Sequence, residues 1–138
     1  MVRAIVPFRR WHVEWLLSGE KSPYDIETLM QMEKQNSWTA VGDGKPVACG
    51  GTVLQWPGRS LAWTCMGPES GRHMRWLTRE ASRVLGAVRG RVEATVRRDF
   101  DLGHRWARML GFAVETPVLE AYGPQGEDHV GYVRMNRG

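Results

Sequence analysis

The sequence has no run of about 18 apolar residues, which is the minimum length for a membrane-spanning helix. It also has no internal repeat and no low-complexity segment. Cysteine is scarce, because Cys49 and Cys65 are the only two, and their spacing fits no metal site. Lysine is scarce too, with three residues among 19 basic ones. We therefore expect no membrane partner, no bound metal and no disulfide framework.

The amino terminus lacks the features of a secretory signal. Its short apolar stretch is interrupted by Pro7 and followed by the basic pair Arg9-Arg10, with no cleavage site. A cytoplasmic protein is the expectation. The 138 residues, 42% hydrophobic and 25% charged, can bury the core of a single domain covering residues 1–138. The net charge of +4 is compatible with an anionic cofactor. Only the number of arginines would suggest nucleic-acid binding, and we do not expect that function.

Hydrophobic periodicity predicts alternating helices and strands in the order β-α-α-β-β-β-α-β-α-β-β. The expected strands are 4–8, 38–41, 47–56, 61–66, 92–96, 112–121 and 130–135. The expected helices are 11–17, 26–35, a long one that begins near 74 and ends near Gly86 or Gly90, and 102–110. Tight turns join three consecutive strands, which must therefore be antiparallel. A strand-helix-strand unit after this meander implies a right-handed crossover. The fold class is thus α/β, with a mixed sheet of about seven strands and helices on both faces.

Two local features of the meander have structural consequences. The glycine pair Gly50-Gly51 lies inside a strand and indicates either a bulge or a close approach of another backbone. Counting back along both strands from the turn at Pro57-Gly58 places Cys49 and Cys65 on different faces of the sheet. We therefore expect both cysteines to be buried, reduced thiols.

The segment 67–73 connects a strand to the longest helix and is a candidate anion site. Backbone N–H groups at a helix start are unpaired, and the helix dipole is positive there. Gly71 gives room for close approach, Ser70 can cap the helix, and Arg72 and Arg75 add positive charge. The alternative is an ordinary capped helix with a solvated basic face.

Two segments resemble the Gcn5-related N-acetyltransferase (GNAT) family. The segment 71–77 resembles its pyrophosphate loop, Arg/Gln-x-x-Gly-x-Gly/Ala: Gly71 matches the first glycine, whereas Pro68 and His73 depart from the pattern. The segment 106–112 resembles its late helix, which ends in Gly-Phe, here Gly111-Phe112. Over nearly its full length the chain is most similar in pattern to small GNAT-like proteins of tailed phages.

This resemblance implies a GNAT-like sheet and acetyl-coenzyme A, or another acyl-coenzyme A, as co-substrate. In the family the fourth and fifth strands splay apart, and the pantetheine lies between them along the fourth strand. The residues that the resemblance implies for cofactor binding are Thr64, Cys65, Met66, Ser70, Gly71, Arg72, His73, Arg75 and Trp106.

The catalytic groups are less well marked. Direct attack of an amine on a thioester needs a base for the ammonium proton and an acid for the thiolate. Glu93 and Glu69 lie near the expected gap and are candidate bases, although either can instead be a surface carboxylate paired with arginine. Where the family has a tyrosine as general acid, this chain has Ala107, and where it often has asparagine, this chain has Phe100. We expect the helix to face the cofactor channel at position 107, so that Ala107→Tyr leaves the fold intact.

The resemblance implies transfer of an acetyl or other small acyl group to an unknown amine. The alternative is a non-catalytic GNAT-fold phage protein that is associated with the virion or binds a host protein, which the missing tyrosine and the loop mismatches favour. If the chain is phage-encoded, the expected location is the host cytoplasm or the virion.

Overall fold

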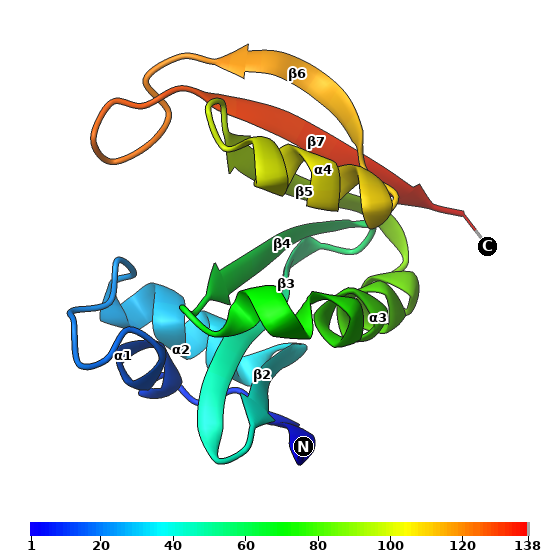
Figure 1. Ribbon diagram of the computed structural model, residues 1–138. Helices are drawn as coiled ribbons and strands as arrows, with labels where there is room; N and C mark the ends of the chain where they lie inside the picture. Colours follow the sequence, from blue (N-terminus) through cyan, green and yellow to red (C-terminus); the bar gives the residue numbers. More distant parts are fainter. Residues whose placement is uncertain (138) are drawn as a thin grey trace.

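A seven-stranded sheet with helices on both of its faces forms the protein, as the computed structural model of residues 1–137 shows (Figure 1). The strands are β1 (Arg3–Pro7), β2 (Ser37–Gly42), β3 (Lys45–Trp56), β4 (Arg59–Met66), β5 (Gly90–Arg97), β6 (Ala113–Leu119) and β7 (His129–Asn136). The helices are α1 (His12–Leu16), α2 (Ile26–Lys34), the 3-10 turn η1 (Ser70–His73), α3 (Met74–Gly86) and α4 (Asp101–Met109). The predicted order of strands and α-helices is confirmed.

The strand order is β1-β2-β3-β4-β5-β7-β6, and β4 and β5 form the one parallel pair in the described sheet. The parallel pairing arises because α3 connects β4 to β5 by a crossover, whereas β2 to β4 are joined by tight turns. The predicted mixed sheet is therefore confirmed.

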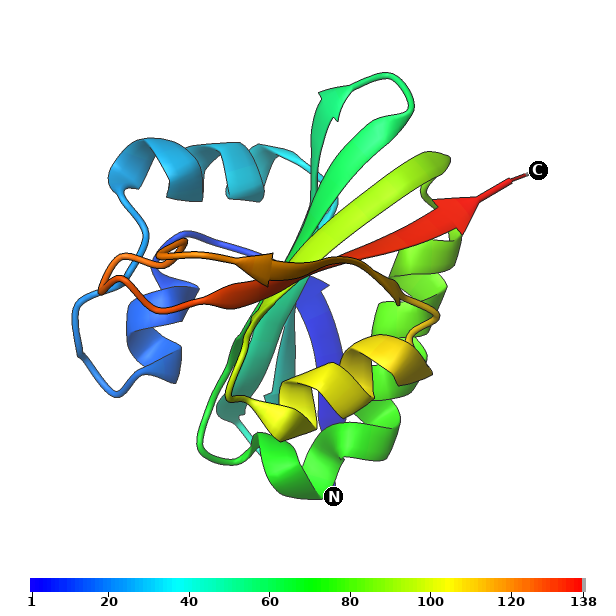
Figure 2. The same ribbon diagram turned by 90° about the horizontal axis from the view of Figure 1, so that it is seen from above.

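Two hydrophobic cores lie on opposite faces of this sheet. One is formed by α3 and α4 with residues such as Leu77, Ala107 and Tyr132. The other is formed by α1 and α2 with Phe8 and Cys49. Figure 2 shows the two pairs of helices on either side of the strands. No helix in residues 1–137 is long and apolar enough to cross a membrane.

Glycine occupies the positions where the predicted turns require it. Asp43 and Gly44, at the β2–β3 hairpin, have φ angles of 51° and 76°, which fit the Asp-Gly turn signal. Gly111 ends α4 with a φ of 87°, the left-handed conformation common just after a helix.

The glycine pair in β3 lets neighbouring atoms approach the β3 backbone closely and does not form a bulge. A Cβ on Gly50 would lie 2.6 Å from the Trp38 ring, and one on Gly51 would lie 2.4 Å from the Asn36 carbonyl oxygen. Pairing with β4 is regular through both glycines. Any side chain there would therefore push β3 away from its neighbours.

The predicted faces of the two cysteines are wrong. Cys49 and Cys65 are direct partners across β3 and β4, so their side chains share the face that is covered by α1 and α2. The register shifts between Leu54 and Trp56, beside the turn. This irregularity places one extra residue in β3. Residues of β3 beyond it therefore point to the opposite face from the one that counting back from the turn predicts. Both cysteines are nevertheless free thiols.

Candidate functional site

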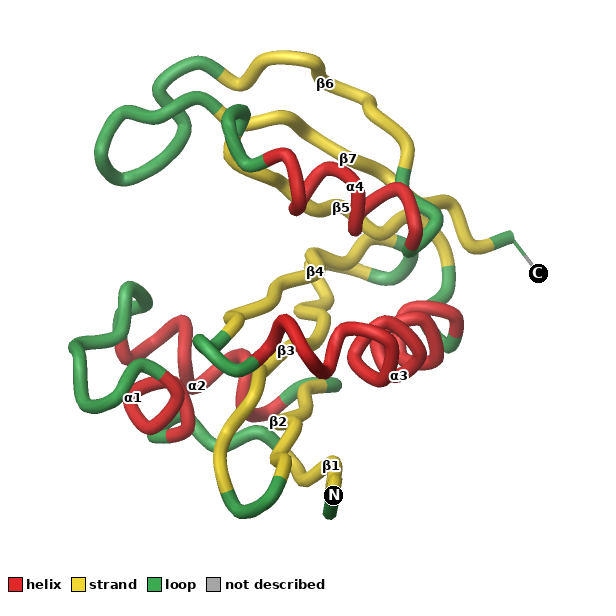
Figure 3. Tube along the Cα trace, viewed as in Figure 1, coloured by secondary structure: helices red, strands yellow, loops and turns green. Residues whose placement is uncertain are grey.

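The gap between β4 and β5 is the feature around which a site can be built. The two strands pair only at Arg59–Arg91, Ser60–Val92 and Leu61–Glu93. Beyond Leu61 they diverge, and residues 62–66 of β4 have no partner on β5 (Figure 3). Such a free edge exposes backbone donors and acceptors that an extended ligand can use.

The backbone direction along β4 decides which residues face this gap. The Gly67 N–H donates to the Val47 carbonyl oxygen on β3 over 2.9 Å. Successive residues of a strand direct their backbone groups to opposite sides, so Met66 and Thr64 direct theirs toward the gap. Cys65 directs its backbone toward its partner on β3, and its side chain packs under α1 and α2. Thr64 and Met66 thus fit the expected cofactor-binding role, whereas Cys65 is not placed for it.

The turn after β4 differs from the expected capped helix. The chain passes through η1 before α3 begins, and neither segment has a side-chain cap. The predicted cap by Ser70 is therefore wrong: Ser70 is the first residue of η1, whose N-cap position is Glu69, and its backbone N–H donates to the Gly67 carbonyl oxygen at 3.1 Å. A Cβ on Gly71 would meet no atom within 4 Å. Glycine there keeps open space beside the turn, which fits the close approach of a ligand.

The arginines of this turn are exposed and lightly paired. Arg72 lies 3.3 Å from the carboxylate of Glu69, in an exposed ion pair that contributes little to stability. Arg75, on the first turn of α3, is exposed and forms no ion pair with the described residues. The Arg75 guanidinium is thus available to an anion, and that of Arg72 is held only by this exposed pair. Glu69 is engaged by Arg72, as the alternative interpretation anticipated.

His73 lies with its side chain turned into the protein. It is 1% exposed, and its Nδ1 accepts a hydrogen bond from Arg3 Nε at 3.1 Å. A Cβ on Gly42 would lie 2.9 Å from its ring, so the glycine in β2 makes room for it. The imidazole therefore anchors the turn to β1 and β2, and only the backbone of His73 is left for a ligand.

The two α4 residues that the resemblance marked are both packed against the protein. The indole Nε1 of Trp106 donates to Thr78 Oγ1 over 2.8 Å and so joins α4 to α3. Ala107 is 6% exposed and belongs to the core that contains Leu110 and Tyr132. The prediction that position 107 faces an open channel is therefore wrong, because that side of α4 covers β5 and β7.

Glu93 is held in a charge network at the narrow end of the gap. Its carboxylate accepts hydrogen bonds from Arg59 Nη2 at 2.9 Å and Arg91 Nε at 2.8 Å, and Arg91 also pairs with Glu115. The guanidinium of Arg59, aided by Arg91, lowers the pKa of Glu93 to about 2. So weak a base takes an ammonium proton poorly, and the geometry matches the alternative of an arginine-paired carboxylate.

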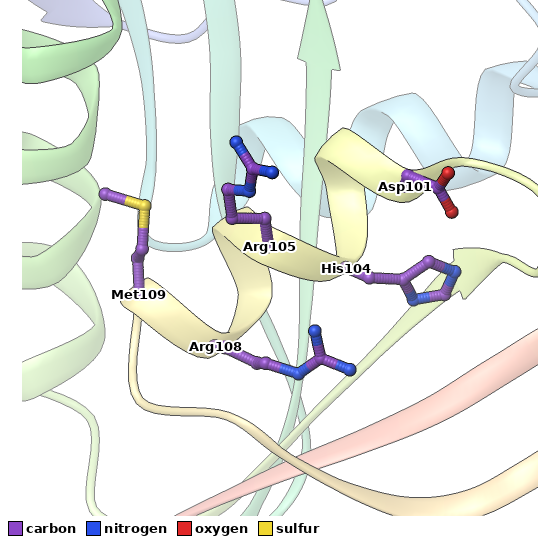
Figure 4. A pocket seen from close by; sticks show the side chains of 5 residues that line it. All are labelled: Asp101, His104, Arg105, Arg108 and Met109. Atoms are coloured by element: carbon purple, nitrogen blue, oxygen red, sulfur yellow. The ribbon is translucent and has the colours of Figure 1, made fainter.

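An open pocket lies along the outer face of α4 and is lined by Asp101, His104, Arg105, Arg108 and Met109. Figure 4 shows the Arg105 and Arg108 side chains extending in different directions from α4, so they do not converge on one ligand. Both ring nitrogens of His104 are engaged, Nδ1 with the Tyr132 hydroxyl at 2.7 Å and Nε2 with the Arg98 carbonyl at 2.9 Å. The imidazole of His104 therefore has no free ring nitrogen to act as a general base in this pocket. Residues 1–137 also contain no cluster of three metal-ligating side chains.

The sequence analysis missed the aromatic residues beside β4. Trp63 lies on the face of α1 and α2, with its ring centroid 5.0 Å from Phe8 and 6.3 Å from Tyr24. Its Nε1 is buried and has no hydrogen-bond partner among the described residues. No sequence signal distinguishes this tryptophan from the six others, because an unpaired donor is visible only in three dimensions.

No protein-family model matches the sequence, and no curated protein sequence matches it either. Solved structures match over nearly the whole chain. Ard1 from Thermoplasma volcanium has a TM-score of 0.77 at 13% identity, with all of both chains covered. The ribosomal-protein-S18-alanine N-acetyltransferase from Escherichia coli has a TM-score of 0.71 at 16% identity, covering 99% of this chain and 97% of that one.

A third match is an acetyltransferase of the GNAT family from Streptococcus pneumoniae, with a TM-score of 0.72 at 14% identity, covering 96% of this chain and 98% of that one. Similarity at these identities establishes the architecture. The protein therefore has the fold of the GNAT acetyltransferases, as the element order and the Gly111-Phe112 helix end predicted.

Proposed function

We propose that the protein transfers an acetyl or other small acyl group from coenzyme A to an amine. The observation that carries this proposal is the early end of the β4–β5 pairing at Leu61 and Glu93, which leaves residues 62–66 of β4 with free backbone groups. A pantetheine arm carries amide groups that can pair with such an edge. Coenzyme A supplies the activated acyl group as a thioester, and the chain supplies the binding surface.

Each part of the cofactor has candidate partners. Thr64 and Met66 offer backbone groups to the pantetheine. Gly71 leaves space for the pyrophosphate, where Arg72 and Arg75 supply positive charge. The negative charge of the cofactor phosphates would be attracted by the two arginines and by the positive end of the α3 helix dipole.

Two features favour a second function, a non-catalytic GNAT-fold protein that is associated with a phage virion or binds a host protein. Ala107 cannot protonate a thiolate, and Glu93 is held by two guanidinium groups. Both features are also compatible with slow acyl transfer. General acid or base catalysis typically raises a rate by on the order of 10²–10⁴-fold, which is only part of an enzyme's total rate acceleration.

Binding of acetyl-coenzyme A separates the two functions. We expect it to raise the melting temperature of the wild type. Gly71→Asp should weaken this shift, because a carboxylate would stand in the space reserved for the pyrophosphate. Gly71→Ala is the matched control: its methyl group meets no atom within 4 Å, so the free protein should keep its stability. If Gly71→Asp binds acetyl-coenzyme A with unchanged affinity, the proposed phosphate site is contradicted. If the wild type does not bind acetyl-coenzyme A, the non-catalytic function is favoured.

A further inference from the structure

Positive charge is concentrated on one of the two helical layers. The elements η1, α3 and α4 carry six arginines, no lysine and two carboxylates, Glu80 and Asp101. Their surplus of four positive charges equals the net charge of +4 of the whole chain. The helices α1 and α2, on the opposite face of the sheet, carry three carboxylates and one lysine. All six arginines are exposed, namely Arg72, Arg75, Arg79, Arg83, Arg105 and Arg108.

The outward side of α3 presents almost nothing but arginine. Arg75, Arg79 and Arg83 follow one another at intervals of four residues and so form one stripe along the helix. The exposed positions of α3 are these three arginines and Gly86. At a rise of about 1.5 Å per residue, the stripe is about 12 Å long. It therefore extends well beyond the turn at Gly71, where the pyrophosphate is proposed to bind.

The stripe works against the stability of α3. Like charges four residues apart on a helix repel each other, and positive charge near a helix start opposes the helix dipole. Glu80 offsets Arg83 alone, at 2.9 Å. Arg75 and Arg79 form no ion pair with another residue among 1–137. An arrangement that is retained although it weakens the helix indicates a partner that supplies the missing negative charge.

The positive surface continues onto α4, which the hydrogen bond from Trp106 Nε1 to Thr78 Oγ1 holds beside α3 at 2.8 Å. Arg105 and Arg108 also form no ion pair in the part of the chain that the structure describes. Their side chains extend in different directions (Figure 4). Diverging arginines cannot enclose a small anion, whereas a long polyanion can contact each of them along its length.

We propose that Arg79, Arg83, Arg105 and Arg108 form a surface that binds the phosphate backbone of a double-stranded nucleic acid. The number of arginines in the sequence did not predict this function, but their placement on one face supports it. A guanidinium group pairs with phosphate through two parallel N–H donors, which fits the use of arginine without lysine on these helices. The duplex is a docking partner distinct from the acyl acceptor, so the inference goes beyond the proposed transfer.

Other polyanions fit this surface less well. A single strand needs aromatic rings on which its bases stack, and the one aromatic residue of α3, Trp76, is half-buried against Arg3. A membrane or an acidic protein needs exposed apolar area, but the apolar side of α3 is buried in the core. On α4 the exposed apolar residues Leu102 and Met109 lie at opposite ends. Phosphate contacts read no sequence, so binding should be independent of sequence.

Fluorescence anisotropy with a DNA duplex of random sequence, about 20 base pairs long, tests the proposal. Replacing Arg79, Arg105 and Arg108 together by glutamine removes three positive charges from the surface. The matched control replaces the three lysines of the chain, which are exposed and lie outside η1, α3 and α4, so that both variants have the same net charge: Lys21, Lys34 and Lys45. The arginine variant should lose at least about tenfold in affinity at about 0.1 M salt, and the lysine variant should bind nearly as the wild type does.

The salt dependence of binding counts the phosphates that are contacted. Each contact contributes about −0.9 to the slope of log K against log salt concentration, so the arginine variant should flatten this slope by about 2.7. Equal losses in the two variants would mean that only net charge matters, and would overturn the inference. It is also overturned if the wild type does not bind the duplex at about 50 mM salt. Binding to phosphatidylglycerol vesicles in place of the duplex would assign the surface to a membrane.

Acetyl-coenzyme A distinguishes this surface from the proposed cofactor site. It should leave most of the duplex bound, because Arg79 and Arg83 lie further along α3 than the turn at Gly71. Complete release of the duplex would place both ligands at the turn and contradict a separate surface. If the duplex binds and acetyl-coenzyme A does not, the proposed transfer fails and the nucleic-acid surface stands.

Arg79→Glu tests whether the stripe weakens the helix. It places a carboxylate four residues from both Arg75 and Arg83, and so replaces two repulsions by two attractions. The melting temperature should rise while the affinity for the duplex falls. Lys34→Glu, which reverses the same charge on α2, should leave duplex binding unchanged. A lower melting temperature in Arg79→Glu would mean that the stripe stabilises the fold, and would contradict the inference.

Discussion

Arg3 donates a hydrogen bond from Nε to Nδ1 of His73 over 3.1 Å and so joins β1 to the turn before α3. The bond requires an unprotonated Nδ1, because a protonated imidazole has no lone pair to accept it. Burial, followed by the nearby guanidinium groups of Arg3 and Arg72, lowers the pKa of His73 below its ordinary value of 6.5. The neighbouring carboxylates of Asp43 and Glu69 oppose this shift and do not reverse it.

The first prediction is a loss of stability in mild acid. Because the folded pKa lies below 6.5, the unfolded chain binds more protons as the pH falls through 6.5, and the free energy of unfolding decreases. His73→Asn keeps an acceptor for Arg3 but cannot titrate. Urea unfolding of both proteins between neutral pH and pH about 5 should therefore show a shallower decline in the variant. Equal slopes would contradict a contribution from His73, and the same comparison could then be made at His12, whose pKa is also lowered.

The second prediction concerns Glu93. Its pKa of about 2 lies below the ordinary 4.5, so its contribution to stability is present above pH 4.5 and is lost as the pH falls toward 2. Glu93→Gln should lower the free energy of unfolding at neutral pH by about 1 kcal/mol, as for partly solvated ion pairs. The difference from the wild type should narrow in strong acid. Any acyl transfer to an amine should continue in the variant. If the variant loses this activity without losing stability, Glu93 acts as a catalytic base after all.

The third prediction is that Cys49 and Cys65 remain thiols although they are direct cross-strand partners. Burial raises the pKa of Cys49 to about 12 and also raises that of Cys65, so little thiolate is present to begin disulfide exchange. Intact mass without reductant should show no loss of two hydrogens. A thiol reagent should modify the half-buried Cys65 before the buried Cys49 in the folded protein. Rapid modification of both would contradict this burial.

The sequence predicted the parts of the fold that local patterns determine. Turn residues such as Asp43-Gly44 and the helix end at Gly111 mark the boundaries, and the order of elements then leaves few topologies. Register was not predictable, because the irregularity between Leu54 and Trp56 carries no sequence signal and reverses the faces of the cysteines. The directions of side chains in the site were not predictable either. His73 turns inward because its hydrogen-bond donor, Arg3, lies 70 residues away in the sequence.

The last prediction concerns Ala107→Tyr, the substitution that restores the family's usual residue. A tyrosine at an open channel position would be tolerated, but Ala107 is 6% exposed and packed among core residues that include Leu110 and Tyr132. Adding extra methylene groups to a well-packed core typically costs about 1–3 kcal/mol, and a whole ring should cost at least as much. We expect urea unfolding to show a loss of at least this size, with the native fold retained. Ala107→Ser is the control, since it adds one oxygen and little volume. If Ala107→Tyr is instead as stable as the wild type, the ring has found the gap between β4 and β5, and its hydroxyl can then be tested as an acid by measuring whether thiol release from acetyl-coenzyme A becomes faster.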